Sequence, residues 1–361
     1  PFVENNTPFR NLIINGDMQV IQRGTTAGLT SDNYGGPDRF GYNIIDAGTW
    51  TVSQDTDVPT GQGFHKSLKL DCTTADASVA AGSVFRFQQH IESQFLARAL
   101  HGTSDAKKMT ASFWIKWDNS IGGNFAVDII NMNNSNDRTV SKLFSYTADS
   151  GWQKYIWNIP ADTGGNALTN DNTGNYYLQI FLAGGTNVTS GTMNTTWATR
   201  TNANRAAGQT IQSASNTSNN VYITGFQLEV ADAASDFEHL PYDVQLARCQ
   251  RYYYVHTQPM TGNNEPMVVG AYYSATQVNG HVPFKVPMRT SPSLVCTDVS
   301  GHFTIFRNSG SDAVNNFTAG ELTENMGEIY NNSDVASGTA GHACLLATNN
   351  SSANLAFNAE L

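Results

Sequence analysis

Aromatic and amide side chains within one polar segment are the strongest candidates for binding chemistry in this sequence. Residues 195–205 contain Trp197, Asn202, Asn204 and Arg205 among small and polar residues. A tryptophan offers a flat apolar face, an asparagine both donates and accepts hydrogen bonds, and an arginine presents a planar fork of donors. A sugar could use this set, because its C–H face stacks on a ring while its hydroxyls form hydrogen bonds. A neighbouring subunit could use it equally, and Trp197 could instead pin the loop to its own domain.

Trp114 is a second candidate for a ligand or subunit contact. Residues 110–117 show the alternation of a strand, with Phe113, Ile115 and Trp117 on one side. Successive side chains of a strand point to opposite faces, so Trp114 points away from Phe113. We therefore expect Trp117 in the core and Trp114 on the opposite, accessible face.

No residue is predicted to be catalytic. The sequence contains no Walker loop, no complete G-x-G-x-x-G and no H-E-x-x-H motif. Residues 102–106 come nearest to a nucleophile elbow, but they lack its last glycine and lead into a strand instead of a helix. Glu238 beside His239 could act as an acid–base pair, although a hydrogen bond that positions the chain is the preferred interpretation. We expect a protein that is not an enzyme.

The sequence also predicts no metal and no cofactor. Residues 131–137 and 170–175 are rich in oxygen ligands, but neither follows the spacing of a calcium loop, and turn-forming asparagines explain both. The cysteines lack the spacing of a zinc site and are interpreted as buried thiols of a chain made in a reducing cytosol, with disulfides as the alternative. They are Cys72, Cys249, Cys296 and Cys344.

The charge of the chain argues against two classes of partner. The formal net charge of the 361 residues is −10, and no basic run is longer than Lys107-Lys108. Nucleic-acid binding needs a positive face that displaces counterions from phosphates, and binding to an anionic membrane surface needs the same. We expect no nucleic acid and no membrane insertion, since no apolar run reaches the roughly 18 residues of a spanning helix.

Strand patterns predict an all-β chain of two β-sandwich domains. Only 14% of the residues are charged, and the abundant Asn, Thr, Ser and Gly favour turns and strand faces over helix interiors. The expected core of the first domain comprises Phe113, Ile115, Trp157, Ile180 and Ile223. Strands are predicted over 11–17, 49–53, 67–73, 110–117, 155–159, 178–182, 221–230, 267–274, 281–288, 294–297, 302–307, 342–347 and 354–361, and helical spacing over 90–100.

The expected domain organisation has four parts. An N-terminal arm covers residues 1–10, and the first β-sandwich domain covers 11–240. A helical connector covers 241–255, where Tyr242, Leu246, Cys249 and Tyr253 recur at helical spacing, and a smaller β domain covers 256–361.

Several collinear motifs resemble a family of phage tail-fibre and virion-surface proteins. They are NLIINGDMQVIQRG (11–24), DRF (38–40), SFWIK (112–116), TTW (195–197), TNANR (201–205), ITGFQLEV (223–230), FEH (237–239) and LARCQRYY (246–253), with weaker likeness in VPMRTSP (286–292) and FNAEL (357–361). The resemblance covers roughly residues 9–254. It implies a first domain similar to carbohydrate-binding jelly rolls, and it implies no catalytic residues.

The resemblance implies a structural protein of a bacteriophage virion that is made in the host cytoplasm. We expect attachment to a host-surface glycan; a capsid decoration protein without ligand and a glycan-degrading tail enzyme are the alternatives. The expected partners are other virion proteins and further copies of the chain in a homotrimer, which would give the long loops 162–175 and 184–220 something to pack on. Because the sequence starts at Pro1, we expect that an initiator methionine has been removed and that the chain is nearly a whole gene product. Such a chain would have no fibre shaft, which favours a place at a fibre tip or on the capsid surface.

Overall fold

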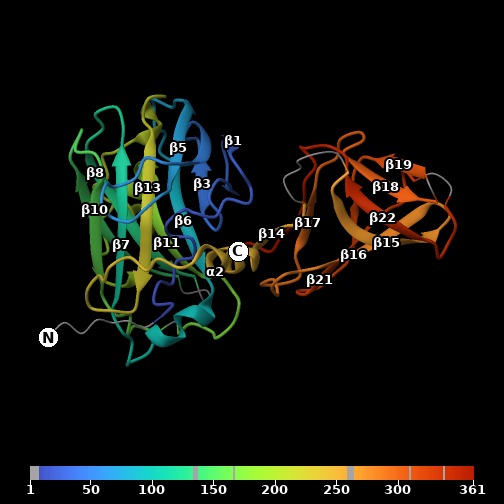
Figure 1. The fold of residues 1–361 in the computed structure, drawn as a ribbon. Helices are drawn as coiled ribbons and strands as arrows, with labels where there is room; N and C mark the ends of the chain where they lie inside the picture. Colours follow the sequence, from blue (N-terminus) through green and yellow to red (C-terminus); the bar gives the residue numbers. More distant parts are fainter. Residues whose placement is uncertain (1–7, 133–136, 166, 258–263, 309, 336–337) are drawn as a thin grey trace. The chain divides into compact units, whose positions relative to one another are not determined.

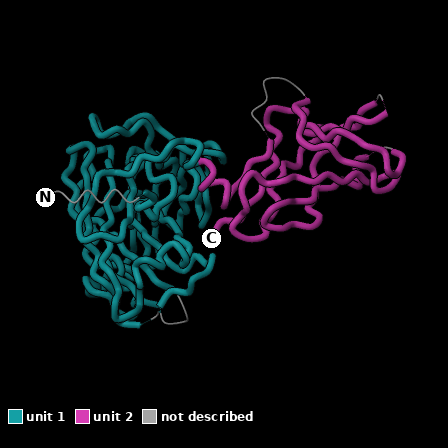
Figure 2. The backbone as a smooth tube through the Cα atoms, turned by 60° about the horizontal axis from the view of Figure 1, so that its bottom comes forward, with its two compact units in different colours: residues 1–245 teal, residues 246–361 magenta. Residues whose placement is uncertain are grey.

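The computed structural model describes residues 8–132, 137–165, 167–257, 264–308, 310–335 and 338–361. The chain divides into two compact units, residues 1–245 and 246–361, which Figure 2 shows in different colours. The expected N-terminal arm falls mostly on residues 1–7, outside the described residues.

Unit 1 is a jelly-roll β-sandwich of two antiparallel sheets (Figure 1). Sheet A has the order β1 (Thr26–Leu29), β4 (Thr49–Asp55), β5 (Ser67–Thr74), β13 (Val221–Glu229), β7 (Met109–Trp117) and β10 (Gln153–Ile159). Sheet B has the order β12 (Ala198–Thr199), β9 (Arg138–Tyr146), β8 (Gly123–Asn131), β11 (Tyr176–Gly184), β6 (Val84–Ile91), β3 (Gly41–Ile45) and β2 (Asn33–Tyr34). The chain changes sheet at each step from β5 to β8, so neighbours in sequence lie in opposite layers.

The core of unit 1 lies between these sheets and confirms the expected strand faces. The five predicted core residues Phe113, Ile115, Trp157, Ile180 and Ile223 are all buried, as is Trp117. Aromatic rings contribute much of the packing; the Phe113 ring, for example, stacks on Tyr155 with the ring centroids 5.7 Å apart. Burial of large apolar side chains stabilises such a sandwich by roughly 25 cal/mol per Å².

One predicted strand of unit 1 was wrong, and one predicted helical segment is helical only in part. Residues 11–17 form no strand, because side-chain amides take the place of a ladder: the Asn15 amide, for example, bonds the backbone N–H and C=O of Val20 at 2.9 and 2.8 Å. The helical spacing over 90–100 instead covers the end of β6 and a 3-10 helix, η1 (Ser93–Ala99). Strand pairing overrides the helical pattern there, since His90 lies opposite Tyr177 of β11.

Unit 2 is a smaller β-sandwich with its own core. Its three-stranded sheet has the order β14 (Tyr253–Val255), β23 (Leu355–Asn358) and β17 (Ser293–Cys296). Its seven-stranded sheet has the order β19 (Gly310–Val314), β18 (Phe303–Arg307), β22 (Ala343–Thr348), β15 (Pro266–Ser274), β16 (Gln277–Pro283), β21 (Met326–Asn331) and β20 (Thr318–Leu322). A Cβ on Gly327 would lie 2.6 Å from the Phe357 ring, so this glycine lets β21 and β23 pack closely.

In unit 2 the sequence missed β19, β20 and β21, which are short, and it placed β16 a few residues late. In unit 1 it missed β1, β2, β3, β8, β9 and β12, and it recognised only the end of β6, as part of a helical pattern. Helix α2 (Tyr242–Gln250) lies within the expected connector, but its predicted stripe is incomplete. Cys249 is buried while Tyr242 is 54% exposed, and Tyr253 belongs to β14. No described helix is both long enough and apolar enough to cross a membrane.

Candidate functional site

Trp114 lies on the outer face of sheet A, where it lines a cavity of about 370 Å³. Within the sheet it sits between Lys154 on β10 and Thr224 on β13. The cavity is lined by residues of unit 1 alone: Gly61, Gln62, Gly63, Phe64, Ser112, Trp114, Lys154, Gly225, Asp236, Phe237 and His239. We call it the Trp114 cavity.

Gly225 forms the floor of the Trp114 cavity at an irregularity of β13. The pairing of β13 with β7 shifts register between Thr224 and Gln227, and Gly225 has a φ of +63°. A Cβ at this position would lie 2.7 Å from Phe64 Cζ and 3.0 Å from Trp114 Cδ1. Glycine is therefore needed both for the left-handed backbone and for the approach of the two rings.

Three further rings form one wall of the cavity. The ring centroids of Phe64 and Phe237 are 5.0 Å apart, and His239 lies 5.3 Å from Phe64 and 4.9 Å from Phe237. The contacts are tilted or edge-to-face, the geometry that aromatic quadrupoles favour. Because the rings hold one another, this wall is ordered without a ligand.

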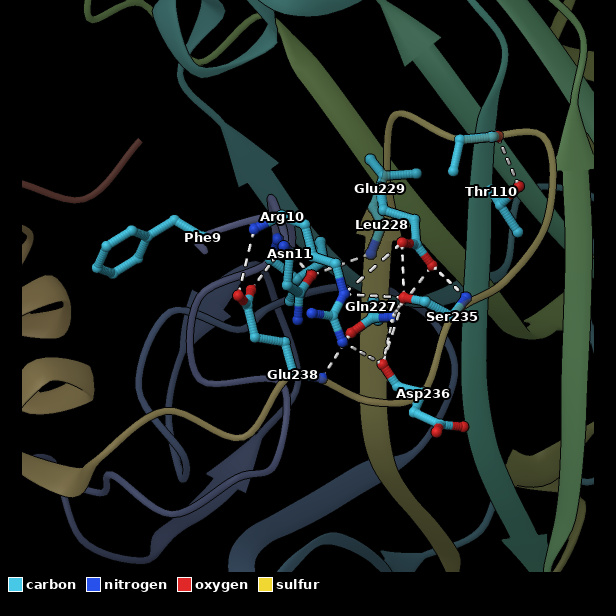
Figure 3. Close-up of polar contacts among 12 residues, drawn as sticks. Phe9, Arg10, Asn11, Thr110, Gln227, Leu228, Glu229, Ser235, Asp236 and Glu238 are labelled. Carbon is cyan, nitrogen blue, oxygen red and sulfur yellow. Dashed lines mark hydrogen bonds and ion pairs between the residues drawn. The ribbon is translucent and has the colours of Figure 1, made fainter. Parts of the chain in front are cut away.

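Glu238, between Phe237 and His239 in sequence, holds the start of unit 1 through hydrogen bonds (Figure 3). Its carboxylate accepts hydrogen bonds from the backbone N–H groups of Arg10 at 3.3 Å and Asn11 at 2.8 Å. Its own N–H donates to Gln227 Oε1 at 2.9 Å. The side chain of Glu238 thus acts in chain positioning, as the preferred interpretation had it, and not in an acid–base pair with His239.

A second layer of hydrogen bonds holds the same segment (Figure 3). Glu229, 2% exposed, accepts from the backbone N–H and the hydroxyl of Ser235, each at 2.8 Å. Arg10 Nε donates to Ser235 Oγ at 2.8 Å, and Arg10 Nη2 donates to the Asp236 carbonyl at 2.6 Å. We call Arg10, Asn11, Glu229, Ser235 and Glu238 the latch. It joins the start of unit 1 to the segment that carries Phe237 and His239.

Trp197 is pinned to its own sandwich. Its Nε1 donates to the Pro160 carbonyl at 2.8 Å, and its ring lies 4.7 Å from His101 and 6.3 Å from Tyr176. The ring packs against the core of unit 1. The third interpretation of this residue, an internal anchor, is the one that matches its contacts.

Asp162 is a buried carboxylate that pairs with Arg138, and Arg138 also donates to the carbonyl of Trp197. Asp162 is 1% exposed and receives two hydrogen bonds of 2.8 Å from Arg138, one of 3.0 Å from the Gly164 N–H, and His101 Nε2 at 3.3 Å. Burial alone would raise the pKa of this carboxyl, but the hydrogen bonds from His101, Arg138 and Gly164 outweigh it and lower the pKa below its usual range.

The other residues of the 195–205 segment do not form a common binding surface. Arg205 is 4% exposed, and its Nε donates to Asp128 Oδ2 at 2.8 Å on sheet B. Asn204 Oδ1 accepts from the Thr192 N–H at 3.1 Å, and of the four candidate residues in this segment only Asn202 is exposed. The expected cluster is corrected in this respect: the loop folds back on sheet B because Arg205 finds its counter-ion there. The described parts of the loops 162–175 and 184–220 likewise find packing partners within unit 1.

Of the expected contact residues, Trp114 alone reaches the Trp114 cavity. Phe64, Gly225 and Phe237 were missed, because the cavity brings together five separate segments between residues 61 and 239. Alternation in the motif SDFEH (235–239) could have indicated that Phe237 and His239 share a side opposite Glu238.

The described residues contain no group of three or more His, Cys, Asp or Glu side chains that could hold a metal ion. In the candidate calcium loop 170–175, Asp171 Oδ1 accepts from the Thr173 N–H at 3.0 Å, which is a turn. Residues 133–136 of the other candidate loop lie outside the described residues. The four cysteines form no disulfide, and three of them are buried.

No family model matches the chain, and the curated proteins give no match either. Solved structures match in part. The enzymatically active domain of bacteriophage CBA120 tailspike protein 4 is 12% identical with a TM-score of 0.31, over 62% of this chain and 22% of that one. A CBM4 structure is 14% identical with a TM-score of 0.30, over 60% and 98%.

The C-terminal family 22 carbohydrate-binding module of Clostridium thermocellum Xyn10B is 11% identical with a TM-score of 0.32, over 63% of this chain and 99% of that one. The chain spans only about a fifth of the tailspike domain. These overlaps are partial, and the β-sandwich fold is established by the sheets of the chain itself.

Proposed function

We propose that this chain is a non-enzymatic structural protein of a bacteriophage virion whose first unit binds a glycan of the host surface in the Trp114 cavity. The observation that carries the proposal is the cavity itself. Aromatic rings line the cavity, and the side chains of Gln62, Ser112, Lys154 and Asp236 supply hydrogen-bond donors and acceptors. A volume of about 370 Å³ lies within the roughly 300–1,000 Å³ of ligand pockets.

A glycan array probed with the full chain tests this binding. We expect retention of a defined set of glycans without release of products. Failure to retain any glycan, at concentrations where the chain is folded and monodisperse, would contradict the proposal.

The absence of catalysis is part of the proposal. Glycoside hydrolysis generally uses two carboxyl groups about 5–9.5 Å apart across the sugar. Asp236 is the one carboxylate among the described residues that line the Trp114 cavity. New reducing ends, released from a bound polysaccharide by the purified chain, would favour the tail-enzyme alternative.

The place on the virion rests on the resemblance of residues 9–254 to tail-fibre and virion-surface proteins. Labelling intact particles with an antibody to this chain separates the candidates, since label on tails favours a fibre and label on heads favours capsid decoration. The proposed homotrimer now rests on the same resemblance, because the long loops have partners within unit 1. A monomeric mass in native solution and on the particle would contradict it.

A further inference from the structure

The outer face of sheet B carries a second set of groups suited to a ligand. On β6 the side chains of Arg86, Gln88 and His90 point outward and are partly exposed, while Phe87 and Gln89 between them are buried. Alternate residues of a strand lie about 7 Å apart on one face, so the three form a row roughly two or three sugar units long.

Arg86 lies opposite Asn43 of β3 and Phe181 of β11. Its Nε donates to Asn43 Oδ1 at 2.9 Å, its Nη2 donates to the same oxygen, and its guanidinium lies 5.7 Å from the Phe181 ring centroid. The Asn43 amide in turn donates to Asp32. A neutral amide therefore separates Arg86 from the nearest carboxylate in this row of contacts.

The neighbouring arginines already have counter-ions. Arg205 Nε lies 2.8 Å from Asp128, and Arg200 Nη1 lies 3.2 Å from Asp137. Among the ion pairs of the described residues none includes Arg86, on which Asp128 and Asp32 act only at longer range. Burial, and then repulsion from Arg205, lower the pKa of Arg86 to about 9, so the side chain still carries its charge at neutral pH.

Planar groups beside Arg86 are held in one continuous network. Arg205 donates to Gln179, Gln179 donates to Gln88, and Gln88 Nε2 lies 3.0 Å from His90 Nε2. The His90 ring packs edge-on against Tyr177, with the ring centroids 4.0 Å apart. Fixed amides and a ring at the end of the row are suited to hydroxyls and to the C–H face of a sugar, because they need no ordering when the ligand binds.

We propose that this face binds an acidic glycan, with Arg86 pairing to a sugar carboxylate and the Gln88–His90–Tyr177 end of the row holding a neighbouring sugar. The inference rests on the proposed glycan-binding function, but it uses other residues and the other sheet. An arginine that no carboxylate contacts directly is a natural partner of a sugar carboxylate, since a charge-assisted bidentate bond fits the planar guanidinium.

Trigalacturonate and its methyl ester test the inference, because they share one sugar chain and differ in charge. We expect the full-length protein to bind trigalacturonate about tenfold more tightly than the ester in calorimetry at low salt. R86Q should abolish this preference, and N43D should do the same by placing a carboxylate against Arg86. K142Q removes an exposed positive charge from β9 of the same sheet and should keep the preference.

Equal affinity of the wild type for the two ligands, no binding of trigalacturonate, or an unchanged preference in folded R86Q or N43D would each overturn the inference. The proposed function fails separately. If neutral glycans on the array bind and W114A removes them while trigalacturonate is ignored, only the acidic-glycan inference is lost. If no glycan of either kind binds, both are lost.

Discussion

On both outer faces of unit 1 every second strand residue points outward, but sheet A carries a cavity walled by aromatic rings and sheet B carries a network of polar side chains. On sheet A a register shift at Gly225 leaves room for Phe64 and Trp114 to converge over the backbone, which opens a cavity walled by rings. On sheet B the pairing of β3 with β6 is regular, and the pairing of β6 with β11 shifts register only beyond Phe181, so the arginine and amide side chains form one network across the sheet. The register shift at Gly225 thus accompanies a pocket, whereas the amide network lies on directly paired residues, Gln179 with Gln88 and Tyr177 with His90.

The largest effect is expected from D162N, which acts on the sheet B side of the comparison. Removing one partner of a buried ion pair costs about 3–5 kcal/mol, here because Arg138 loses its counter-ion. All six tryptophans lie in unit 1, so tryptophan fluorescence in urea measures this loss. We expect weaker trigalacturonate binding, since the loop that supplies Arg205 is loosened, and unchanged binding at the Trp114 cavity.

The same carboxylate gives a pH dependence of known sign. Its pKa is lowered in the folded protein, so its stabilisation is complete above the unfolded pKa of about 4 and is lost as the pH falls toward the folded value. The wild type should therefore lose its advantage over D162N in urea titrations between about pH 4 and pH 2. A constant difference between the two proteins over this range would show that Asp162 is not held as described.

G225A should be the most damaging small change on sheet A. The new Cβ meets the Phe64 and Trp114 rings in a left-handed backbone, and we expect a loss of about 2–4 kcal/mol in the free energy of unfolding. G61A is the matched control, because Gly61 also has a positive φ of +74° but open space around its Cβ. The control should lose about 1–2 kcal/mol, and equal losses would mean that the rings do not crowd Gly225.

E238Q tests the latch behind the ring wall. The neutral amide retains one acceptor oxygen for the two backbone N–H groups of Arg10 and Asn11, and we expect unfolding to be easier by about 1–3 kcal/mol. D236N changes an exposed carboxylate two residues away and should stay within about 0.5 kcal/mol of the wild type in urea. A D236N effect as large as that of E238Q would contradict the assigned role of Glu238.

The sandwich could be predicted from the sequence because local alternation decides it. Residues 110–117 and 155–159 place Phe113 and Trp157 on one side without any long-range information, and both are buried. The site could not be predicted in the same way. The sequence left the role of Trp197 open between a sugar, a neighbouring subunit and its own domain, because its hydrogen-bond partner, the carbonyl of Pro160, lies 37 residues earlier.

Glu238 shows the same limit. The sequence favoured a positioning role for Glu238 but could not name its partners, because the hydrogen-bond donors Arg10 and Asn11 lie 228 and 227 residues away. The Trp114 cavity likewise depends on a register shift at Gly225 that no local pattern specifies. Roles set by distant backbone groups become visible only once the chain is folded.

The most direct test of the central claim compares W114A with I156A, using the glycan that the wild type retains most tightly on the array. Ile156 is an exposed apolar residue on the outer face of β10 in the same sheet, so both changes remove surface hydrophobic area and should leave unit 1 folded. We predict that W114A weakens binding by about 2 kcal/mol, or roughly thirtyfold in calorimetry, while I156A binds as the wild type does. Equal affinities of folded W114A and I156A would contradict the assignment of glycan binding to the Trp114 cavity.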